Sequence, residues 1–572
     1  MAKLMLWTGS IAACLLGGIV SASAQQEPTP VVDPVFSDQS KGGSPGCALG
    51  VYRDGKVVYA KGYGLANLEE NVAITPRSVF DVGSVSKQFT AASIVLLEQQ
   101  GKLRLDDDVR KYIPELPDYS QHGVSKITLL HLLNHTSGLR DYVALFYLAG
   151  IHVDNVTTNE DARALIVRQK GLNFSPGTNW QYSSSGYLLL SLVVERVSGR
   201  PLREFAAENI FRPLGMTHTA WRSDHTSLMP HRALGYDRND KGEYALSVSY
   251  GEETGDGMLH TSIEDLQKWD ENYYSGKVGG KDFAADMEEP AKLKDGSIVG
   301  YAKGLFIDNY RGLPSIWHPG ASAGYSAYLM QVPALHFSVA CLCNVANARP
   351  WIRGKEIVDL YLADHMKPEP EHSLPDLTPE QAKGLAGLYQ NPNNGDVLRV
   401  SITDGKLQAD CADGPLNLRT ITTTQFLLID YRPFETSLKF EPAHDASPRQ
   451  FIVNTADERP ARFEAVDEVK VSPAELLAYS GDYWSDELHA TYRLAINKED
   501  LWLTDLIGGD GHSHPNIIPF AQLRPVRRDE FKLNGANLVF RFARNKKDEV
   551  TGFALNGFRE RGLLFARTQD KN

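Results

Sequence analysis

Strand-like hydrophobic runs lie at both ends of the first 362 residues. Residues 47–52 and 57–60 are apolar runs on either side of an Asp54-Gly55 turn, a pattern that predicts a β-hairpin. Residues 327–332 and 337–343 form a second pair of apolar runs. The two pairs are far apart along the chain, and we expect them to share one antiparallel sheet.

Helical periodicity separates the two strand pairs. Apolar positions repeat with helical spacing over about 85–100 and 187–197, and Gly101 and Gly199 follow as helix stops. A third helical stretch covers 352–362. The pattern predicts an α/β (α+β) fold in which helices flank an antiparallel sheet.

A cluster of proline and charged residues at 364–378 interrupts these patterns and predicts an interdomain linker. Beyond it, short alternating runs predict two tandem antiparallel β modules, each with about eight strands and barrel-like. Apolar positions repeat in the same order in the two modules, and chance alignment in β-rich sequence is the alternative. The matching pairs are Tyr389 and Tyr483, Leu407 and Leu501, Leu418 and Leu523, Phe426 and Phe531, Phe440 and Phe542, Phe451 and Phe553, and Phe463 and Phe565.

These patterns predict the division of the chain. The expected parts are a signal peptide at 1–24, a mixed domain at 25–363, the linker at 364–378, and the β modules at 379–470 and 471–572.

The N-terminus has the features of an export signal. Lys3 precedes a mostly apolar stretch, and Ala22-Ser23-Ala24 is a small-residue cleavage pattern. We therefore expect a periplasmic or secreted protein without a membrane span after cleavage. The alternatives are an uncleaved anchor and a lipoprotein attached at Cys14, which lies inside the apolar run.

Composition restricts the partners. The apolar share of 42% and charged share of 23% are typical of a folded soluble protein. The net charge of -12 argues against nucleic-acid binding, which needs a basic surface. No cofactor is expected, and the oligomeric state is left open.

Four cysteines remain after Cys14: Cys47, Cys341, Cys343 and Cys411. Cys341 and Cys343 share one face of a predicted strand, and their spacing is not that of metal ligands. We expect buried small side chains and no metal site, while a disulfide stays open for an exported chain.

Ser84 and Lys87 are the first candidates for chemistry. Gly83 precedes a predicted helix, so Ser84 lies near its N-terminus and Lys87, three residues later, lies on the same face. A neutral lysine amine can take the proton of a serine hydroxyl, and the helix N-terminus favours developing negative charge. The alternative is an ordinary N-capping serine.

Two later segments carry further candidates. Tyr182, on a loop before the second helix, is a possible phenol base, or else an ordinary surface tyrosine. His318 and Gly320 open a late strand, where backbone N–H groups could join that of Ser84 in an oxyanion hole.

In this order, Ser84-x-x-Lys87, Tyr182-x-Ser184 and His318-x-Gly320 resemble the motifs of the serine β-lactamase and penicillin-recognising family. The likeness is closest to its class C and serine peptidase branch. It covers about residues 40–362, and the stretches 132–139, 213–216 and 261–266 support it. The β modules look like those of D-aminopeptidase-like members.

The resemblance implies the roles of these residues. Ser84 would attack the substrate carbonyl, Lys87 and Tyr182 would share the proton transfers, and the N–H groups of Ser84 and Ala321 would hold the oxyanion. His318 would stand where many members carry a lysine, and Ser184 where they carry an asparagine.

The two departures change the expected substrate. A hydroxyl at Ser184 reaches less far than a carboxamide, and His318 weakens the positive charge that would bind a carboxylate. We therefore expect a peptidase or amidase acting on small peptides, including ones with D- or unusual residues. An esterase, a weak β-lactamase and a non-catalytic penicillin-binding sensor are the alternatives.

One loop of the second module is a candidate cover for the catalytic cleft. Residues 506–514 are glycine-rich and polar, and an exposed hairpin tip is the alternative interpretation.

Overall fold

The computed structural model describes residues 29–568, except 40–41, 121–122, 124–125, 153, 369–376, 412–413, 429–433, 442–448, 456–457, 509–519 and 558. The predicted signal peptide, Cys14 and the centre of the predicted linker lie outside the described residues. Within the described part of the chain, no helix is long and apolar enough to cross a membrane.

A six-stranded antiparallel sheet organises the first part of the chain, in the order β10-β11-β12-β13-β1-β2. The N-terminal hairpin pairs directly with the late strands, because β1 lies beside β13 from Cys47 opposite Cys343 to Arg53 opposite Phe337. The predicted sharing of one sheet is therefore confirmed. The strands are β1 (Cys47–Arg53), β2 (Lys56–Tyr63), β10 (Phe306–Tyr310), β11 (Leu313–Ser322), β12 (Tyr325–Val332) and β13 (Phe337–Cys343).

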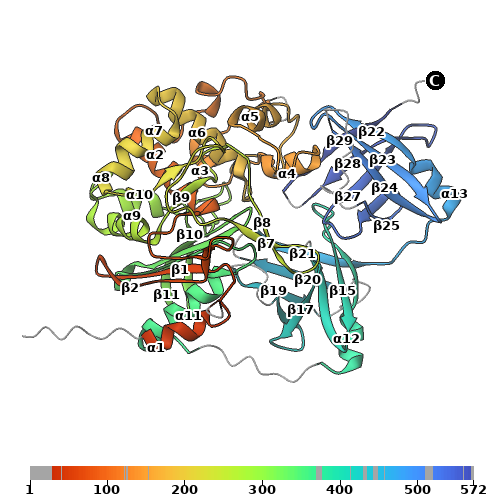
Figure 1. Cartoon of the computed structure of the whole chain (residues 1–572). Helices are drawn as coiled ribbons and strands as arrows, with labels where there is room; N and C mark the ends of the chain where they lie inside the picture. The colour runs from red at the N-terminus through yellow and green to blue at the C-terminus, as the bar shows by residue number, and fades with distance from the viewer. Residues whose placement is uncertain are drawn as a thin grey trace, which may run out of the picture.

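Helices cover both faces of this sheet (Figure 1). Alternate residues of β13 point to opposite faces, so Val339 packs with Ile357 of α11 while Leu342 packs in the cluster of the helical region. The helices are α1 (Thr29–Val32), α2 (Lys87–Gln99), α3 (Leu129–Leu133), α4 (Tyr142–Leu148), α5 (Asn159–Val167), α6 (Ser184–Ser198), α7 (Leu202–Ala206), α8 (Arg212–Leu214), α9 (Ile263–Ser275), α10 (Phe283–Glu288) and α11 (Pro350–Leu362).

Small strands connect this region to the sheet. They are β3 (Leu65–Asn67), β4 (Val72–Ala73), β5 (Phe80–Asp81), β6 (Ala220–Trp221), β7 (Tyr236–Arg238), β8 (Tyr244–Leu246) and β9 (Leu259–Thr261). Of these, β5 pairs with β9 immediately before Ser84, which ties the start of α2 to the middle of the chain.

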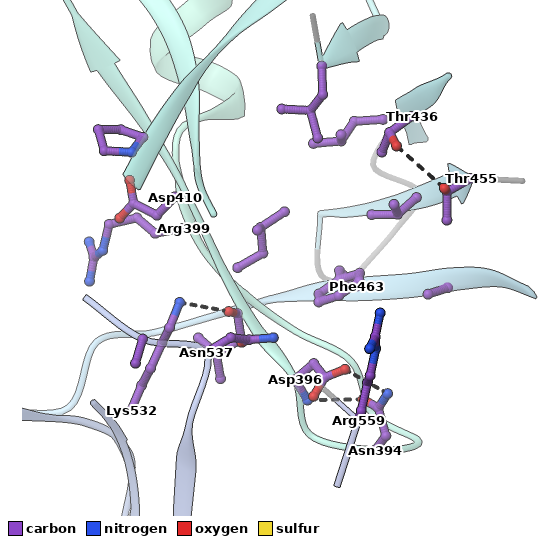
Figure 2. Close-up of a pocket in the computed structure, with 18 of the residues that line it drawn as sticks. Asn394, Asp396, Arg399, Asp410, Thr436, Thr455, Phe463, Lys532, Asn537 and Arg559 are labelled. Carbon is purple, nitrogen blue, oxygen red and sulfur yellow. Dashed lines mark hydrogen bonds between the residues drawn. The ribbon is translucent and has the colours of Figure 1, made fainter. Parts of the chain in front are cut away.

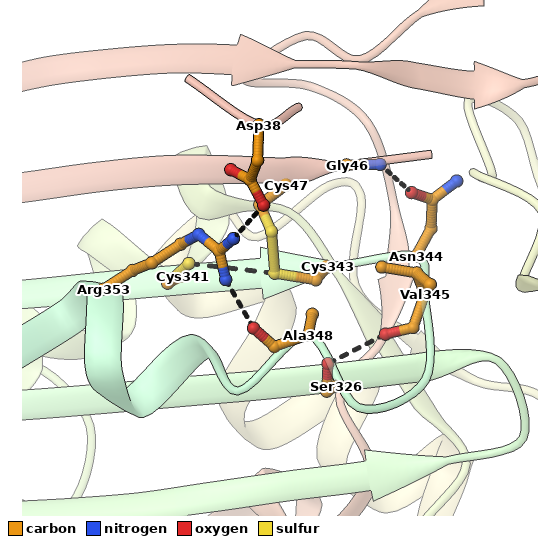
Figure 3. Close-up of a disulfide and its surroundings, with 10 residues drawn as sticks. All are labelled: Asp38, Gly46, Cys47, Ser326, Cys341, Cys343, Asn344, Val345, Ala348 and Arg353. Atoms are coloured by element: carbon orange, nitrogen blue, oxygen red, sulfur yellow. Dashed lines mark hydrogen bonds and ion pairs between the residues drawn. A yellow bond between two sulfur atoms is a disulfide. The ribbon is translucent and has the colours of Figure 1, made fainter. Parts of the chain in front are cut away.

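The register of the sheet also forms a disulfide. Cys47 lies opposite Cys343 and is bonded to it, while Cys341 is a buried free thiol (Figure 3). Both Cys341 and Cys343 are buried, as expected, and the disulfide that the sequence left open is formed by Cys343. The pairing joins residues separated by 296 positions, which strand periodicity alone does not reveal.

Two eight-stranded β modules follow, on the same side of the mixed domain in Figure 1. The first is a closed barrel, and the second is one sheet in the order β24-β23-β22-β29-β28-β27-β26-β25. Each begins with a short helix whose N-terminus carries a capping box, at Thr378 for α12 (Pro379–Leu385) and Ser472 for α13 (Pro473–Leu476). The fold class expected from the sequence is thus confirmed, whereas the domain bounds stay a prediction.

The repeat in the sequence matches the strand order. Each pair of repeated residues lies on strands of the same rank, and all are buried, as in Phe451 on β20 and Phe553 on β28. The first module has β14 (Gly387–Gln390), β15 (Val397–Thr403), β16 (Lys406–Cys411), β17 (Gly414–Thr420), β18 (Gln425–Leu428), β19 (Thr436–Glu441), β20 (Gln450–Thr455) and β21 (Glu458–Val466). The second has β22 (Gly481–Ser485), β23 (Ala490–Asn497), β24 (Asp500–Ile507), β25 (Leu523–Arg527), β26 (Glu530–Leu533), β27 (Val539–Arg544), β28 (Val550–Asn556) and β29 (Leu563–Arg567).

Candidate functional site

Ser84 lies in a 3₁₀ turn, η2 (Gly83–Ser86), that leads directly into α2. Gly83 has a φ of 49°, and a Cβ atom there would lie 2.6 Å from the backbone N of Ala321. Only glycine permits both the left-handed conformation and this close approach. The turn therefore holds Ser84 against strand β11.

Lys87 is fully buried one turn later and faces Ser84. Its Nζ donates to Ser84 Oγ at 3.0 Å and to the carbonyl oxygen of Asp256 at 2.8 Å. The carbonyl fixes the amine in a position from which it can exchange a proton with the serine hydroxyl. The structure thus brings together the first two predicted residues.

Tyr182 lies beside the same amine, at the end of the loop before α6. Lys87 Nζ is 4.9 Å from the centroid of the Tyr182 ring. The hydroxyl of Tyr182 is buried and has no hydrogen-bond partner among the described residues. An unpaired buried hydroxyl is costly, and a catalytic role is one of the reasons for which native structures keep such a group.

His135 packs against the loop that carries Tyr182. The rings of His135 and Tyr182 lie 4.2 Å apart, and the backbone N–H of Ser183 donates to His135 Nδ1 at 3.2 Å. Complete burial, with the nearby Lys87 charge, holds the pKa of His135 well below its usual range, so the ring is neutral. Sequence reasoning assigned it no role, and its only signal was its place in the stretch 132–139.

His318 is also buried and neutral. Burial and then the charge of Lys87 lower its pKa to about 3. Its Nδ1 lies 2.6 Å from the carbonyl oxygen of Pro319 and must donate, so Nε2 accepts from the Tyr301 hydroxyl at 3.1 Å. This position therefore presents no fixed positive charge to a substrate.

Gly320 and Ala321 form the edge of β11 beside the nucleophile. A Cβ atom on Gly320 would lie 1.9 Å from the carbonyl oxygen of Val82 and 3.3 Å from the backbone N of Ser84. The strand can lie this close only because Gly320 has no side chain. The backbone of Ala321 is consequently adjacent to the start of α2, as an oxyanion hole requires.

Ser184 has other partners. Its backbone N–H donates to Asp141 Oδ2 at 3.0 Å, and its hydroxyl bonds to the Asp256 carboxylate, whose pKa burial raises. Ser184 is not among the described residues that line the cavity at Ser84. Its contact with substrate stays a prediction.

Arg559 is a site residue that sequence reasoning missed. It comes from the turn between β28 and β29, and its guanidinium lies 4.9 Å from the centroid of the Tyr182 ring. It also pairs with the buried Asp141 at 3.0 Å. The described residues of 506–514 end at Gly508, so the predicted cover stays untested, and a different loop of the same module reaches the site.

Hydrogen bonds and ion pairs of nearby residues join the turn that carries Arg559 to the mixed domain and to the first barrel. Arg140 Nη2 donates to the carbonyl oxygen of Arg561 at 2.7 Å and pairs through Nη1 with Glu487 at 2.6 Å, both side chains being almost fully buried. Arg561 in turn pairs with Asp396 of the first barrel at 2.5 Å. Burial raises the pKa of Glu560, inside this turn, to about 7.

A cavity of about 890 Å³ connects these parts. Ser84, Tyr182, His318, Gly320 and Ala321 line one end together with Phe306, Pro319 and Trp351, and residues of both β modules line the rest. Figure 2 shows part of the module lining, with Arg559 beside Asn394 and Asp396. The volume lies within the usual range for small-molecule sites, roughly 300–1,000 Å³.

Two groups among the described residues have the donor atoms of a metal site. Cys47, Cys341 and Cys343 form one, but two of these sulfurs are bonded to each other. Asp224, His225 and Glu252 form the other, in which His225 Nδ1 already bonds Glu252 at 2.7 Å. Neither group lies among the residues that line the cavity.

Comparison with known proteins agrees with this arrangement. The model of the Beta-lactamase family matches residues 32–362. A D-aminopeptidase of Gluconobacter oxydans is 28% identical over 361 residues, covering 63% of this chain and 66% of the relative. Penicillin-binding protein 4* of Bacillus subtilis is 31% identical over 294 residues, covering 48% and 63% respectively. The chain thus spans slightly less than two thirds of the length of these relatives.

Solved structures share the fold. An octameric penicillin-binding protein homologue from Pyrococcus abyssi gives a TM-score of 0.53 at 25% identity, covering 76% of this chain and 99% of that one. A structure described as SurE gives a TM-score of 0.51 at 23% identity, covering 76% of this chain and 98% of that one.

Proposed function

The chain belongs to the beta-lactamase family, and from this premise we propose that it is a serine hydrolase that cleaves amide bonds in small peptides through an acyl-enzyme on Ser84. The observation that carries the proposal is the hydrogen bond of 3.0 Å between Lys87 Nζ and Ser84 Oγ at the end of a large cavity.

Acylation follows from this contact. The Lys87 amine, in its neutral form, takes the proton of Ser84 while Oγ attacks the substrate carbonyl carbon. The negative charge that develops on the carbonyl oxygen is held by the backbone N–H groups of Ser84 and Ala321. The close packing at Gly83 and Gly320 supports this placement of the two donors.

Leaving-group protonation is assigned to Tyr182. Its hydroxyl has no hydrogen-bond partner among the described residues, and the centroid of its ring lies 4.9 Å from the Lys87 amine. In the proposed step the phenol gives its proton to the departing nitrogen and takes one from Lys87. Water then attacks the acyl-enzyme by the reverse route and releases the acid.

The substrate class rests on two observations. One of the relatives carries the name D-aminopeptidase, which supports peptides with D- or unusual residues. His318 is neutral, so this position offers no positive charge to a substrate carboxylate. This supports substrates that bind without such a charge. An esterase and a weak β-lactamase are the rivals within the same chemistry.

A substrate panel tests the proposal. p-Nitroanilides and p-nitrophenyl esters of D- and L-amino acids and a chromogenic cephalosporin are compared on the wild-type protein and on Ser84→Ala. We expect turnover of anilides to exceed that of the cephalosporin, with Ser84→Ala at background. If Ser84→Ala hydrolysed these substrates as fast as the wild-type protein, Ser84 would not be the nucleophile.

The lifetime of the covalent adduct on Ser84 distinguishes the proposed enzyme from a non-catalytic sensor. A fluorescent penicillin would label Ser84 of a sensor and stay bound without turnover of any ester or amide. For the proposed enzyme, a mass shift on Ser84 should appear with a poor ester substrate and decay with the rate of product release.

Export to the periplasm or the medium belongs to the same proposal. The predicted signal at 1–24 suggests it, and the Cys47–Cys343 disulfide supports it because disulfides persist in oxidising compartments. Expression of the full chain in a bacterium with two membranes should give a periplasmic protein that starts at Gln25. A lipid-modified Cys14 or an intact N-terminus would contradict the cleavage site.

A further inference from the structure

The cavity at Ser84 continues into the interior of the first β barrel. Strand alternation makes Thr436 and Leu438 on β19, and Val453 and Thr455 on β20, point into the barrel, and all four line the cavity. Phe463 of β21 also lines it. One end of the barrel therefore opens toward the catalytic serine.

Aromatic contacts place this opening of the barrel beside strand β11. Phe306 lies 5.3 Å from the ring of His318, and Phe434 lies 5.1 Å from Phe306 and 5.4 Å from Trp317. Phe434 comes two residues before the inward-facing Thr436. The mouth of the barrel is thus packed directly on β11, the strand that carries His318.

The far end of the barrel is closed by aromatic side chains. Phe440 and Phe451 are buried, with ring centroids 5.0 Å apart, and Tyr389 lies 4.7 Å from Phe451. The barrel interior is therefore a blind pocket whose opening faces Ser84.

The two sides of β15 give the cavity two different linings. Figure 2 shows Thr436, Thr455 and Phe463 on one side, and Arg399, Asp410 and Lys532 on the other. The interior side is mostly apolar. Its described lining residues are Leu398, Leu428, Thr436, Leu438, Val453, Thr455, Ala461 and Phe463.

This lining favours an alkyl chain over a peptide. In a closed barrel the backbone N–H and C=O groups are used in the ladder, so the interior offers few partners to peptide amides. Thr436 and Thr455 supply the hydroxyls of the described interior lining, and they bond each other at 3.4 Å. Peptide groups placed there would lose their hydrogen bonds to water, whereas methylene groups would not.

We propose that the interior of the first barrel binds a long unbranched alkyl chain of the substrate while the scissile carbonyl lies at Ser84. The substrate is then an amphipathic amide or ester, such as an acylated peptide. The polar atoms of this substrate lie outside the barrel, in the part of the cavity lined by Arg399, Asp410 and Lys532. The methylene groups lie inside it, among Leu438, Val453 and Phe463. This inference rests on the proposed serine hydrolase function.

Direct binding tests the pocket without catalysis. Full-length Ser84→Ala is titrated with a fluorescent polyunsaturated C18 fatty acid, and displacement is measured with laurate, butyrate and acetyl-tetraleucine amide. We expect saturable binding that laurate displaces at least tenfold better than butyrate or the peptide. Absence of binding, or displacement by the peptide as effective as that by laurate, overturns the proposal.

Two substitutions on one strand locate the binding site. Ala461 points into the barrel, and the next residue, Arg462, is exposed on the outside. Ala461→Phe should weaken laurate binding at least tenfold, whereas Arg462→Phe should change it less than threefold. Val453→Phe, on the adjacent strand β20, gives a second block if Ala461→Phe does not fold. Equal binding by all folded variants overturns the assignment to the barrel.

Kinetics then connects the pocket to Ser84. For p-nitrophenyl esters from acetate to laurate, kcat/KM of the wild-type protein should rise by up to about fourfold per methylene, and Ala461→Phe should lower the laurate-to-acetate ratio. Laurate binding without hydrolysis of any ester would refute the hydrolase function and leave the pocket intact. Acetate hydrolysis with no chain-length preference and no fatty-acid binding would refute only the pocket.

Discussion

Removal of the Tyr182 hydroxyl should reduce activity without reducing stability. The hydroxyl is buried and has no partner among the described residues, so the folded protein has lost its hydrogen bonds to water without replacement. That loss costs about 1–3 kcal/mol. Tyr182→Phe should therefore leave the free energy of unfolding unchanged or raise it by up to about that amount.

Tyr187→Phe is the matched control. Tyr187 is fully buried in the same region, and its hydroxyl donates to the carbonyl oxygen of Leu133 at 2.7 Å. The same deletion there leaves a buried carbonyl without this donor, so the free energy of unfolding should fall by about 1–3 kcal/mol. The two variants lose the same atom and should shift stability in opposite directions or by clearly different amounts.

Activity should distinguish the two variants in the opposite way, because Tyr182→Phe should lose activity and Tyr187→Phe should keep most of it. General acid–base groups contribute about 10²–10⁴ to rate, so Tyr182→Phe should lower kcat on the best substrate of the panel by that factor. Tyr187→Phe should stay within tenfold at a temperature where it is folded. The measurements are steady-state kinetics and urea unfolding followed by circular dichroism. A kcat of Tyr182→Phe within threefold of wild type, or a loss of stability equal to that of Tyr187→Phe, would refute the role of the phenol.

Three further predictions concern the scaffold of the site. Replacing Cys47 and Cys343 together by serine should lower the free energy of unfolding by about 2–5 kcal/mol, and a reducing agent should lower the melting temperature of the wild type but not of this double variant. Gly320→Ala should lower kcat by about 10²–10³ because its Cβ displaces β11 from Val82, whereas Gly384→Ala, with open space around it, should leave kcat unchanged. His318 has a pKa of about 3 in the folded protein against an ordinary value of 6.5, so its contribution to stability is present above pH 6.5 and is lost as the pH falls toward 3. His318→Gln should therefore lose less stability than wild type between pH 7 and pH 4.5, as measured by urea midpoints.

Each of these has an outcome that would contradict it. A melting temperature that does not respond to reductant would mean that the disulfide does not constrain the fold. Normal kcat in Gly320→Ala would place the oxyanion donors elsewhere. Parallel pH profiles for wild type and His318→Gln would show that His318 is not buried in its neutral form.

The elements of the fold were largely predictable because hydrophobic periodicity is local. The stretch 337–343 became β13 (Phe337–Cys343), and the helical stretches correspond to α2, α6 and α11, with ends shifted by up to three residues. The tandem β modules were visible because repeated Phe and Leu positions keep their order on strands of the same rank.

The candidate site was predictable only in part. Ser84 and Lys87 are three residues apart on one helical turn, so their contact follows from helix geometry. The roles of His135 and Arg559 could not be foreseen, because their contacts with Tyr182 join loops that are far apart in the sequence.

The sequence by itself therefore determined the strands, the helices, the repeated modules and the pairing of Ser84 with Lys87, since each depends on neighbours within a few residues or on an ordered repeat. The tertiary structure alone decided that Cys343 bonds Cys47, that Arg559 lies over Tyr182, and that a β barrel opens toward Ser84. These features depend on sheet register and on how three domains pack, and those are set by contacts between segments hundreds of residues apart.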